Sequence, residues 1–260
     1  LIISGMCADC FTFITVSRPM IVLFTDFGLQ GPYTGQVRAV LQQQAPGIPV
    51  IDLFSDLAPF DIEGAAYLLP AYAGGFIPGT VFVCVVDPGV GGARPGVMLQ
   101  ADGRWYVGPN EGLFSQVARR AENITCHELA LPAGASPSFH GRDVFAPVAA
   151  RLARGVPVTG EPVVTAALDR PDWPDDLYRV VYIDRYGNAI TGVRAAAIGP
   201  DTILKVNGRT LKPARTFSGV TEGVAFWYAN ANGLVEFAVN RGRADAVLAV
   251  EVGTRFDLYE

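Results

Sequence analysis

The chain has few histidines, few cysteines and little charge, and these shortages exclude several classes of function. Its 260 residues contain two histidines and four cysteines, and 17% of them are charged, with a formal net charge of −5. The two histidines lie far apart and fit neither an H-x-x-x-H nor an H-E-x-x-H spacing, which disfavours a catalytic metal. The acidic net charge and the absence of a Lys/Arg run argue against a nucleic-acid partner.

Long apolar runs and the common nucleophile and phosphate motifs are also missing. No apolar span reaches 18 residues, so the sequence predicts no membrane helix and no membrane partner. There is no G-x-S-x-G elbow and no Walker-type loop. Cys84 and Cys126 lie in apolar segments, which is typical of small core residues in a reducing compartment. We therefore expect a cytoplasmic protein.

Residues 1–19 differ from the rest of the chain. They lack a cationic start, and Asp9 interrupts their apolar character, so a signal peptide is not predicted. We expect an extension that precedes a start at Met20 or a disordered tail. Its Cys7-x-x-Cys10 is a single pair, whereas a zinc site needs about four ligands.

From Met20 onward, apolar runs of strand type alternate with segments of helical periodicity. This alternation predicts an α/β domain over residues 20–160, an α/β/α sandwich around a central, mostly parallel sheet. An Asp102-Gly103 hairpin turn should join two of its strands. Expected strands lie at 21–25, 48–54, 81–86, 96–100 and 105–107, and expected helices at 33–41, 61–73, 113–117 and 144–152.

Beyond this region the pattern changes twice. Prolines punctuate residues 161–176 without periodicity, which predicts a linker. Over 177–260 helical patterns give way to short apolar runs separated by Gly and Asn, and we expect a smaller all-β barrel domain. Its expected strands lie at 177–183, 203–206, 224–228, 234–239 and 246–250.

Two short stretches carry the chemistry of the first domain. Asp87-Pro-Gly-Val-Gly-Gly-Ala-Arg94 follows an apolar strand, and Phe139-His140-Gly-Arg-Asp143 precedes a helix. On local evidence a turn is the more common interpretation of the first, a structural histidine of the second, and a helix-capping carboxylate of Asp143. In open α/β sheets, however, ligands gather at the carboxyl ends of strands. An acid, a guanidinium and an imidazole could therefore activate a water or a small anion there.

Other candidates have polar side chains suited to a nucleoside. Asp26 follows the first strand and suits a carboxylate that accepts hydrogen bonds from ribose hydroxyls, although a loop cap is equally compatible. Asn188 ends the Asp184-Arg-Tyr-Gly-Asn turn, and its amide pairs a donor with an acceptor as adenine recognition requires. His127 lies between Cys126 and Glu128 in a segment with a strand pattern, and we expect it to have no functional role.

Taken in order, these stretches resemble one family, the S-adenosyl-L-methionine (SAM) hydroxide adenosyltransferases, which are adenosine-forming SAM hydrolases. That family is similar in fold to the fluorinating and chlorinating SAM enzymes. The resemblance covers the chain from Met20 to about Gly253. The segments that carry it are Thr25-Asp-Phe-Gly28, Pro59-Phe60-Asp61, Asp87-Pro-Gly-Val-Gly91, Gly108-Pro109, Phe139-His-Gly-Arg-Asp-Val-Phe-Ala-Pro147, Ile183-Asp-Arg-Tyr-Gly-Asn188 and Ala238-Val-Asn240.

The resemblance implies hydrolysis of SAM to adenosine and methionine by in-line attack of water at C5′. It implies that Asp87, Arg94 and His140 hold that water, that SAM is the substrate, and that no cofactor or metal is needed. It also implies a homotrimer, with each site formed between the first domain of one subunit and the β domain of its neighbour. A SAM-dependent halogenase and a non-catalytic SAM- or adenosine-binding module remain alternatives.

The resemblance also assigns substrate contacts to both domains. Asp26 would bind the ribose hydroxyls, Asp184 the methionine amino group and Asn188 the adenine. The full implied set is Asp26, Phe60, Gly141, Asp184, Asn188, Asn240 and Arg241. Two departures stand out: Asn110-Glu111 replaces a common Asp-Asn pair, and Ala231 replaces a common Ser that could contact the methionine carboxylate.

Overall fold

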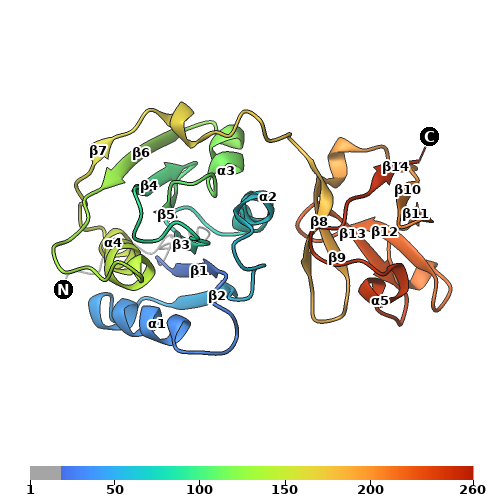
Figure 1. Ribbon diagram of the computed structural model, residues 1–260, viewed down its shortest axis with the longest axis horizontal. Helices are drawn as coiled ribbons and strands as arrows, with labels where there is room; N and C mark the ends of the chain where they lie inside the picture. Colours follow the sequence, from blue (N-terminus) through green and yellow to red (C-terminus); the bar gives the residue numbers. More distant parts are fainter. Residues whose placement is uncertain (1–18, 260) are drawn as a thin grey trace, which may run out of the picture.

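Two seven-stranded sheets, one in each half of the chain, organise the structure (Figure 1). The computed structural model describes residues 19–259. The expectations for residues 1–18, including the Cys7/Cys10 pair, lie outside the described residues.

The sheet of the first domain is half parallel and half antiparallel. Its strands are β1 (Ile21–Thr25), β2 (Val50–Phe54), β3 (Val81–Val85), β4 (Gly96–Ala101), β5 (Arg104–Pro109), β6 (Ile124–Leu129) and β7 (Glu161–Pro162). They lie in the order β2-β1-β3-β5-β4-β6-β7, with β2, β1, β3 and β5 parallel and the remaining neighbours antiparallel. The expected hairpin joins β4 to β5, where Asp102 and Gly103 both have positive φ, as a two-residue hairpin turn requires.

Helices cover both faces of this sheet (Figure 1). They are α1 (Tyr33–Gln44), α2 (Ile62–Ala73), α3 (Ser115–Arg120) and α4 (Ala146–Ala153), the last continuing a π-helical turn, η1 (Gly141–Phe145). Alternate residues of β1 point to opposite faces, so Ile21 and Leu23 pack with α1 and α4, whereas Val22 and Phe24 pack with α2. The predicted α/β/α sandwich is confirmed.

The second domain is a nearly closed barrel. Its elements are β8 (Leu177–Ile183), β9 (Ala189–Arg194), η3 (Ala195–Ala197), β10 (Leu204–Val206), β11 (Arg209–Pro213), η4 (Phe217–Gly219), β12 (Ala225–Ala229), β13 (Leu234–Val239), α5 (Ala244–Leu248) and β14 (Asp257–Leu258). The sheet order is β14-β10-β11-β12-β13-β9-β8. Just before β14, residues 253–256 exchange backbone hydrogen bonds with β8, so the last segment of the chain bridges the two edges. The predicted barrel class is confirmed.

One expected strand of this domain is wrong. Residues 246–250 do not form a strand, because Ala244–Leu248 form helix α5. Alanine favours helix, and Asp245 in the first turn accepts the backbone N–H of Ala246 and pairs with Arg243. Ala249, with a φ of 52°, ends the helix. The sequence pattern also does not predict β9, β11 or β14.

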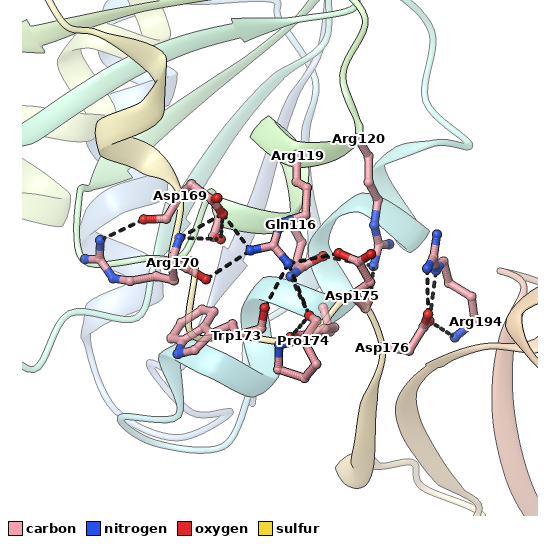
Figure 2. Close-up of polar contacts among 12 residues, drawn as sticks. Gln116, Arg119, Arg120, Asp169, Arg170, Trp173, Pro174, Asp175, Asp176 and Arg194 are labelled. Carbon is pink, nitrogen blue, oxygen red and sulfur yellow. Dashed lines mark hydrogen bonds and ion pairs between the residues drawn. The ribbon is translucent and has the colours of Figure 1, made fainter.

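The segment interpreted as a linker is bound to the first domain along much of its length. β7 pairs with β6, and the short helix η2 (Thr165–Leu168) buries Leu168 completely. Figure 2 shows the two arginines at the end of α3 reaching this segment. Arg119 donates to the carboxylates of Asp169 and Asp175 and to three backbone carbonyls. The linker is therefore held by α3 up to the start of β8.

Apolar packing through α2 joins the two domains. Val181, Ile190 and Leu234 of the barrel belong to the same buried cluster as Leu68 and Leu69 of α2. Within residues 19–259, no helix is both long enough and apolar enough to cross a membrane.

Candidate active site

The two acidic candidates of the first domain follow neighbouring parallel strands. Asp26 comes directly after β1, and Asp87 lies two residues beyond the end of β3. Because β1 and β3 pair in parallel, their carboxyl ends meet at one edge of the sheet. The backbone N–H of Asp26 donates to the carbonyl of Val85, which fixes this junction.

Asp87, Arg94 and His140 form one hydrogen-bonded chain. Arg94 Nε donates to Asp87 Oδ1 at 2.8 Å, and Arg94 Nη2 also donates to Asp87 Oδ2. The same Nη2 lies 2.9 Å from His140 Nδ1. The Arg94 and Asp87 side chains are only 6% and 5% exposed, and His140 is 4% exposed. The three predicted catalytic residues therefore lie together as a buried cluster in which Arg94 contacts both Asp87 and His140.

The hydrogen bond from Arg94 determines the protonation state of His140. A guanidinium can only donate, so Nδ1 must accept, and a neutral ring then carries its proton on Nε2. Burial and then the charge of Arg94 lower the pKa of His140, although Asp87 and Asp143 oppose the shift. Nε2 is buried and has no hydrogen-bond partner among the described residues. His140 thus holds one unused N–H donor.

Two glycines explain how the two motif loops can pack so closely. Gly91 has a φ of 79°, and a Cβ at this position would lie 2.3 Å from the carbonyl oxygen of Pro137. A Cβ on Gly141 would lie 3.1 Å from the Phe27 ring. Gly141 also opens the π-helical turn η1, and such turns are frequent at functional sites.

Asp26 and Phe60 contact each other near the triad. The backbone N–H of Phe60 donates to Asp26 Oδ2 at 3.1 Å. Phe60 has a φ of 66°, a left-handed backbone conformation that is strained for this residue and is of the kind found at ligand sites. The residue is 72% exposed. Burial raises the pKa of Asp26, and the charge of Asp87 adds to the shift, while the Phe60 N–H opposes it.

These residues enclose a cavity of about 320 Å³, termed here the triad cavity. Its lining includes Asp26, Phe60, Asp87, His140 and Gly141, together with Phe27, Tyr33, Pro59, Val85, Val90, Ser138 and Phe139. Arg94 is not part of the lining. It lies behind the cavity, with its guanidinium over the Phe145 ring, and holds Asp87 and His140 in place.

The predicted residues of the second domain line a different cavity of about 900 Å³, termed here the barrel cavity. Asp184, Asn188 and Arg241 belong to its lining. Asp184 Oδ1 accepts the backbone N–H groups of Tyr186 and Asn188, and Asn188 Nδ2 donates to Asp184 Oδ2 at 3.1 Å. Within one chain, the structure does not bring these residues together with the triad.

Asn240 lies outside both cavities. Its Nδ2 donates to the carbonyl of Val220 at 2.7 Å. The neighbouring Arg241 has a φ of 54° and an exposed ion pair with Glu222. Among the described residues, no three His, Cys, Asp or Glu side chains are grouped so that they could hold a metal ion.

Comparison with known proteins identifies the family. The model of the SAM hydroxide adenosyltransferase N-terminal domain matches residues 21–160, and that of the C-terminal domain matches residues 178–257. This chain belongs to the SAM hydroxide adenosyltransferase family. The family resemblance inferred from the sequence is confirmed.

Relatives of the SAM hydroxide adenosyltransferase chain include a hydrolase and a fluorinase. The (R)-S-adenosyl-L-methionine hydrolase of Thermus thermophilus is 43% identical over 255 residues, which cover 91% of this chain and 97% of the relative. A fluorinase of Nocardia brasiliensis is 24% identical and covers 86% of this chain and 91% of the relative. The crystal structure of an uncharacterized conserved protein from Thermotoga maritima, 28% identical, superposes with a TM-score of 0.82 and covers 93% of this chain and 100% of that chain.

This adenosyltransferase chain also has a polar network in the barrel cavity that sequence reasoning missed. Glu236 is 4% exposed and accepts hydrogen bonds from Tyr228 Oη at 2.6 Å and Asn230 Nδ2 at 3.0 Å. Burial raises its pKa, and Asp184 adds to the shift. The only sequence signal is one acid inside the apolar run of β13. Ala231, one of the two departures from the family pattern, lies in the same lining.

The other departure from the adenosyltransferase pattern lies beside the triad loop. A Cβ on Gly89 would lie 2.3 Å from Glu111 Oε1, so the Glu111 carboxylate rests against the turn that follows Asp87. Glu111 Oε2 is buried with no hydrogen-bond partner among the described residues. The substitution therefore changes the support of the loop rather than the cavity lining.

Proposed function

We propose that this protein hydrolyses SAM to adenosine and methionine, with water held by Asp87 and His140 as the nucleophile at C5′. The observation that carries the proposal is the buried cluster of Asp87, Arg94 and His140, whose unused Nε2–H belongs to a residue that lines the triad cavity. The T. thermophilus hydrolase supports the same reaction.

The proposed step needs a positioned oxygen more than a strong acid. Methionine leaves a sulfonium as a neutral thioether, so the electron pair of the C5′–S bond stays on sulfur while the new O–C5′ bond forms. His140 Nε2–H donates to the water oxygen, and Asp87 accepts the water's proton, which passes on to solvent. Holding the water in line contributes up to about 7–11 kcal/mol.

Charge and shape also fit the substrate. Asp26, Asp87 and a neutral imidazole line the triad cavity. Arg94 balances the charge of Asp87, so the Asp26 carboxylate leaves one negative charge, which favours a cationic sulfonium. Asp26 is proposed to accept the ribose hydroxyls, with Phe60 and Gly141 beside the ribose. A halide site would instead present hydroxyl and amide donors without this carboxylate.

We also propose that the barrel cavity of a neighbouring subunit completes the site. Asp184 would receive the methionine amino group, Asn188 would read the adenine, and Asn240 and Arg241 would contribute backbone beside it. A homotrimer of this kind accounts for candidate residues that line two separate cavities within one chain.

The reaction is tested by chromatography of purified protein incubated with SAM in oxygen-18 water. The relatives' names specify the (R) form, so the two sulfonium epimers are assayed separately. We expect adenosine that carries the label at C5′, methionine, and loss of both in His140→Ala. Binding of SAM without turnover would leave the binding module as the correct function. A 5′-halo product formed after addition of chloride or fluoride would establish the halogenase instead.

The shared site is tested by complementation. His140→Ala damages only the first domain and Asp184→Ala only the second, so co-expressed hybrids contain some intact sites if subunits share them. We expect hybrid trimers, sized by light scattering, to regain turnover at low SAM concentration that neither variant has alone. A monomeric protein, or hybrids without recovery, would overturn the trimeric arrangement.

A further inference from the structure

A third cavity of about 300 Å³ lies between the two domains and is lined by three arginines. Arg104 comes from β5, Arg120 from the end of α3 and Arg194 from the end of β9. Its remaining walls are largely apolar and include Tyr106 and Leu234. It shares no residue with the triad cavity and only Asn232 with the barrel cavity.

The charges of this cavity are not balanced. Arg194 pairs with Asp176, but Arg104 and Arg120 have no ion pair among the described residues. Arg104 donates to the carbonyls of Phe76 and Gly74. These are neutral acceptors, so they leave its charge uncompensated.

Arg120 likewise donates only to neutral acceptors, Gln116 Oε1 and the Asp175 carbonyl. The carboxylate in the lining, Asp102, accepts only neutral backbone N–H groups, those of Glu122 and Asn123, so its charge offsets one of the two arginines that lack an ion pair. An excess of positive charge therefore remains at the cavity.

Two of the guanidinium groups face each other across the domain boundary. Figure 2 shows the side chains of Arg120, from the first domain, and Arg194, from the barrel, ending side by side. Burial and then the charge of Arg194 lower the pKa of Arg120, and the carboxylates of Asp176 and Asp175 oppose the shift without cancelling it. Like charges held this close in a partly desolvated place are unfavourable unless a counter-charge lies between them.

We propose that this cavity binds a small oxyanion, a phosphate or a carboxylate, between Arg104, Arg120 and Arg194. Guanidinium groups suit such ligands because their planar donors match carboxylate and phosphate oxygens. The apolar walls leave room for a small body attached to the anion. An anion held there bridges both domains and stabilises their arrangement.

The test is isothermal titration calorimetry of the full chain with sodium phosphate and, separately, with sodium acetate, at constant ionic strength set by chloride. We expect saturable binding of at least one anion, in the millimolar range or tighter, and weakening by about tenfold or more in Arg120→Gln. The matched control, Arg209→Gln, removes one exposed arginine of the barrel and should bind as wild type does.

The separate phosphate and acetate titrations identify the class of ligand. Binding of phosphate alone or of acetate alone assigns the oxyanion class, and either supports the site. No saturable heat with either anion, or equal binding by Arg120→Gln and Arg209→Gln, overturns it. A rise in the free energy of unfolding that needs several hundred millimolar phosphate and is unchanged in Arg120→Gln would reflect exclusion of the solute from the protein surface. This result also overturns the proposal. If circular dichroism shows that Arg120→Gln is unfolded, Arg104→Gln provides the same comparison.

Discussion

The triad cavity and the barrel cavity hold their charged groups in different ways. In the triad cavity, Asp87 and His140 are fixed by one buried guanidinium, and a donor is left over. In the barrel cavity, which is almost three times larger, Asp184 and Glu236 accept hydrogen bonds from neighbouring side chains and turns. The first arrangement suits the positioning of a reacting atom, and the second suits recognition of a substrate's polar groups.

The difference follows from the elements that carry the residues. Asp26 and Asp87 follow parallel strands that pair in the middle of a sheet covered on both faces, so the sheet itself sets their separation. Asp184 and Asn230 lie in turns between antiparallel strands, and these turns lie at opposite ends of the β9–β13 pair. Substitutions in the two cavities should therefore affect different kinetic constants.

The largest expected effect is that of Arg94→Ala. It leaves the buried Asp87 carboxylate without its cation and frees His140 to turn, so kcat should fall by about 10²–10⁴-fold, and stability by about 3–5 kcal/mol. SAM turnover and urea unfolding measure both. Arg38→Ala breaks an Arg–Asp pair whose side chains are 44% and 40% exposed, and it should cost about 0–1 kcal/mol with turnover unchanged. Equal effects of the two variants would show that the buried pair has no special role.

Asp184→Asn should act on KM rather than on kcat. Removing one charge from the barrel cavity weakens binding of an amino group by about 10–100-fold, because hydrogen bonds to charged groups contribute about 1.5–3 kcal/mol. We expect a rise in KM of that size with kcat little changed. Asp201→Asn, an exposed carboxylate on another turn of the same domain, serves as control. A fall in kcat without a rise in KM would place Asp184 in the chemistry instead.

Two glycines with nearly the same φ test how tightly each region is packed. Gly91 in the triad loop and Gly233 in the β12–β13 turn have φ of 79° and 80°, but only Gly91 has a neighbouring atom where a Cβ would lie. Gly233→Ala should cost about 1–2 kcal/mol, the ordinary penalty of a left-handed residue.

Gly91→Ala adds a collision with the backbone of Pro137, which cannot yield as a flexible side chain does. It should therefore cost more than Gly233→Ala in urea unfolding and also lower kcat. Equal costs of the two variants would show that the loop has room to move.

The sequence predicts the triad region better than the barrel region, for the same structural reason. Strand β1 followed by Asp26 and strand β3 followed by Asp87 are local patterns, and parallel pairing brings them together. The position of Arg94 behind the cavity depends on packing against Phe145, which no local pattern encodes. In the barrel, residues 246–250 resemble a strand by composition, but Ala244–Leu248 form helix α5 with Asp245 in its first turn.

Residues that act only through tertiary contacts were not predictable. Glu236 is a single acid in an apolar strand, and its partners Tyr228 and Asn230 are identified only once β12 and β13 pair. Asn188 was recognisable as an amide in a turn, but its bond to Asp184 needs the folded turn. Residue types and strand ends could therefore be predicted from the sequence, whereas the hydrogen-bond partners of the polar side chains could be identified only in the folded structure.

The smallest expected effect is a pH dependence that arises from His140, which lines the triad cavity and has no counterpart in the lining of the barrel cavity. The pKa of His140 is lowered, so the folded protein binds fewer protons than the unfolded chain just below pH 6.5. Its contribution to stability is therefore complete above about pH 6.5 and decreases as the pH falls towards the folded pKa. Over the same range a second proton on the ring would break the bond from Arg94, and kcat should fall.

Proton NMR can follow this titration because the chain has only two histidines, with His127→Gln assigning the signals. A His140 signal that titrates above pH 6.5 would contradict the neutral Nε2–H form on which the proposed water site depends.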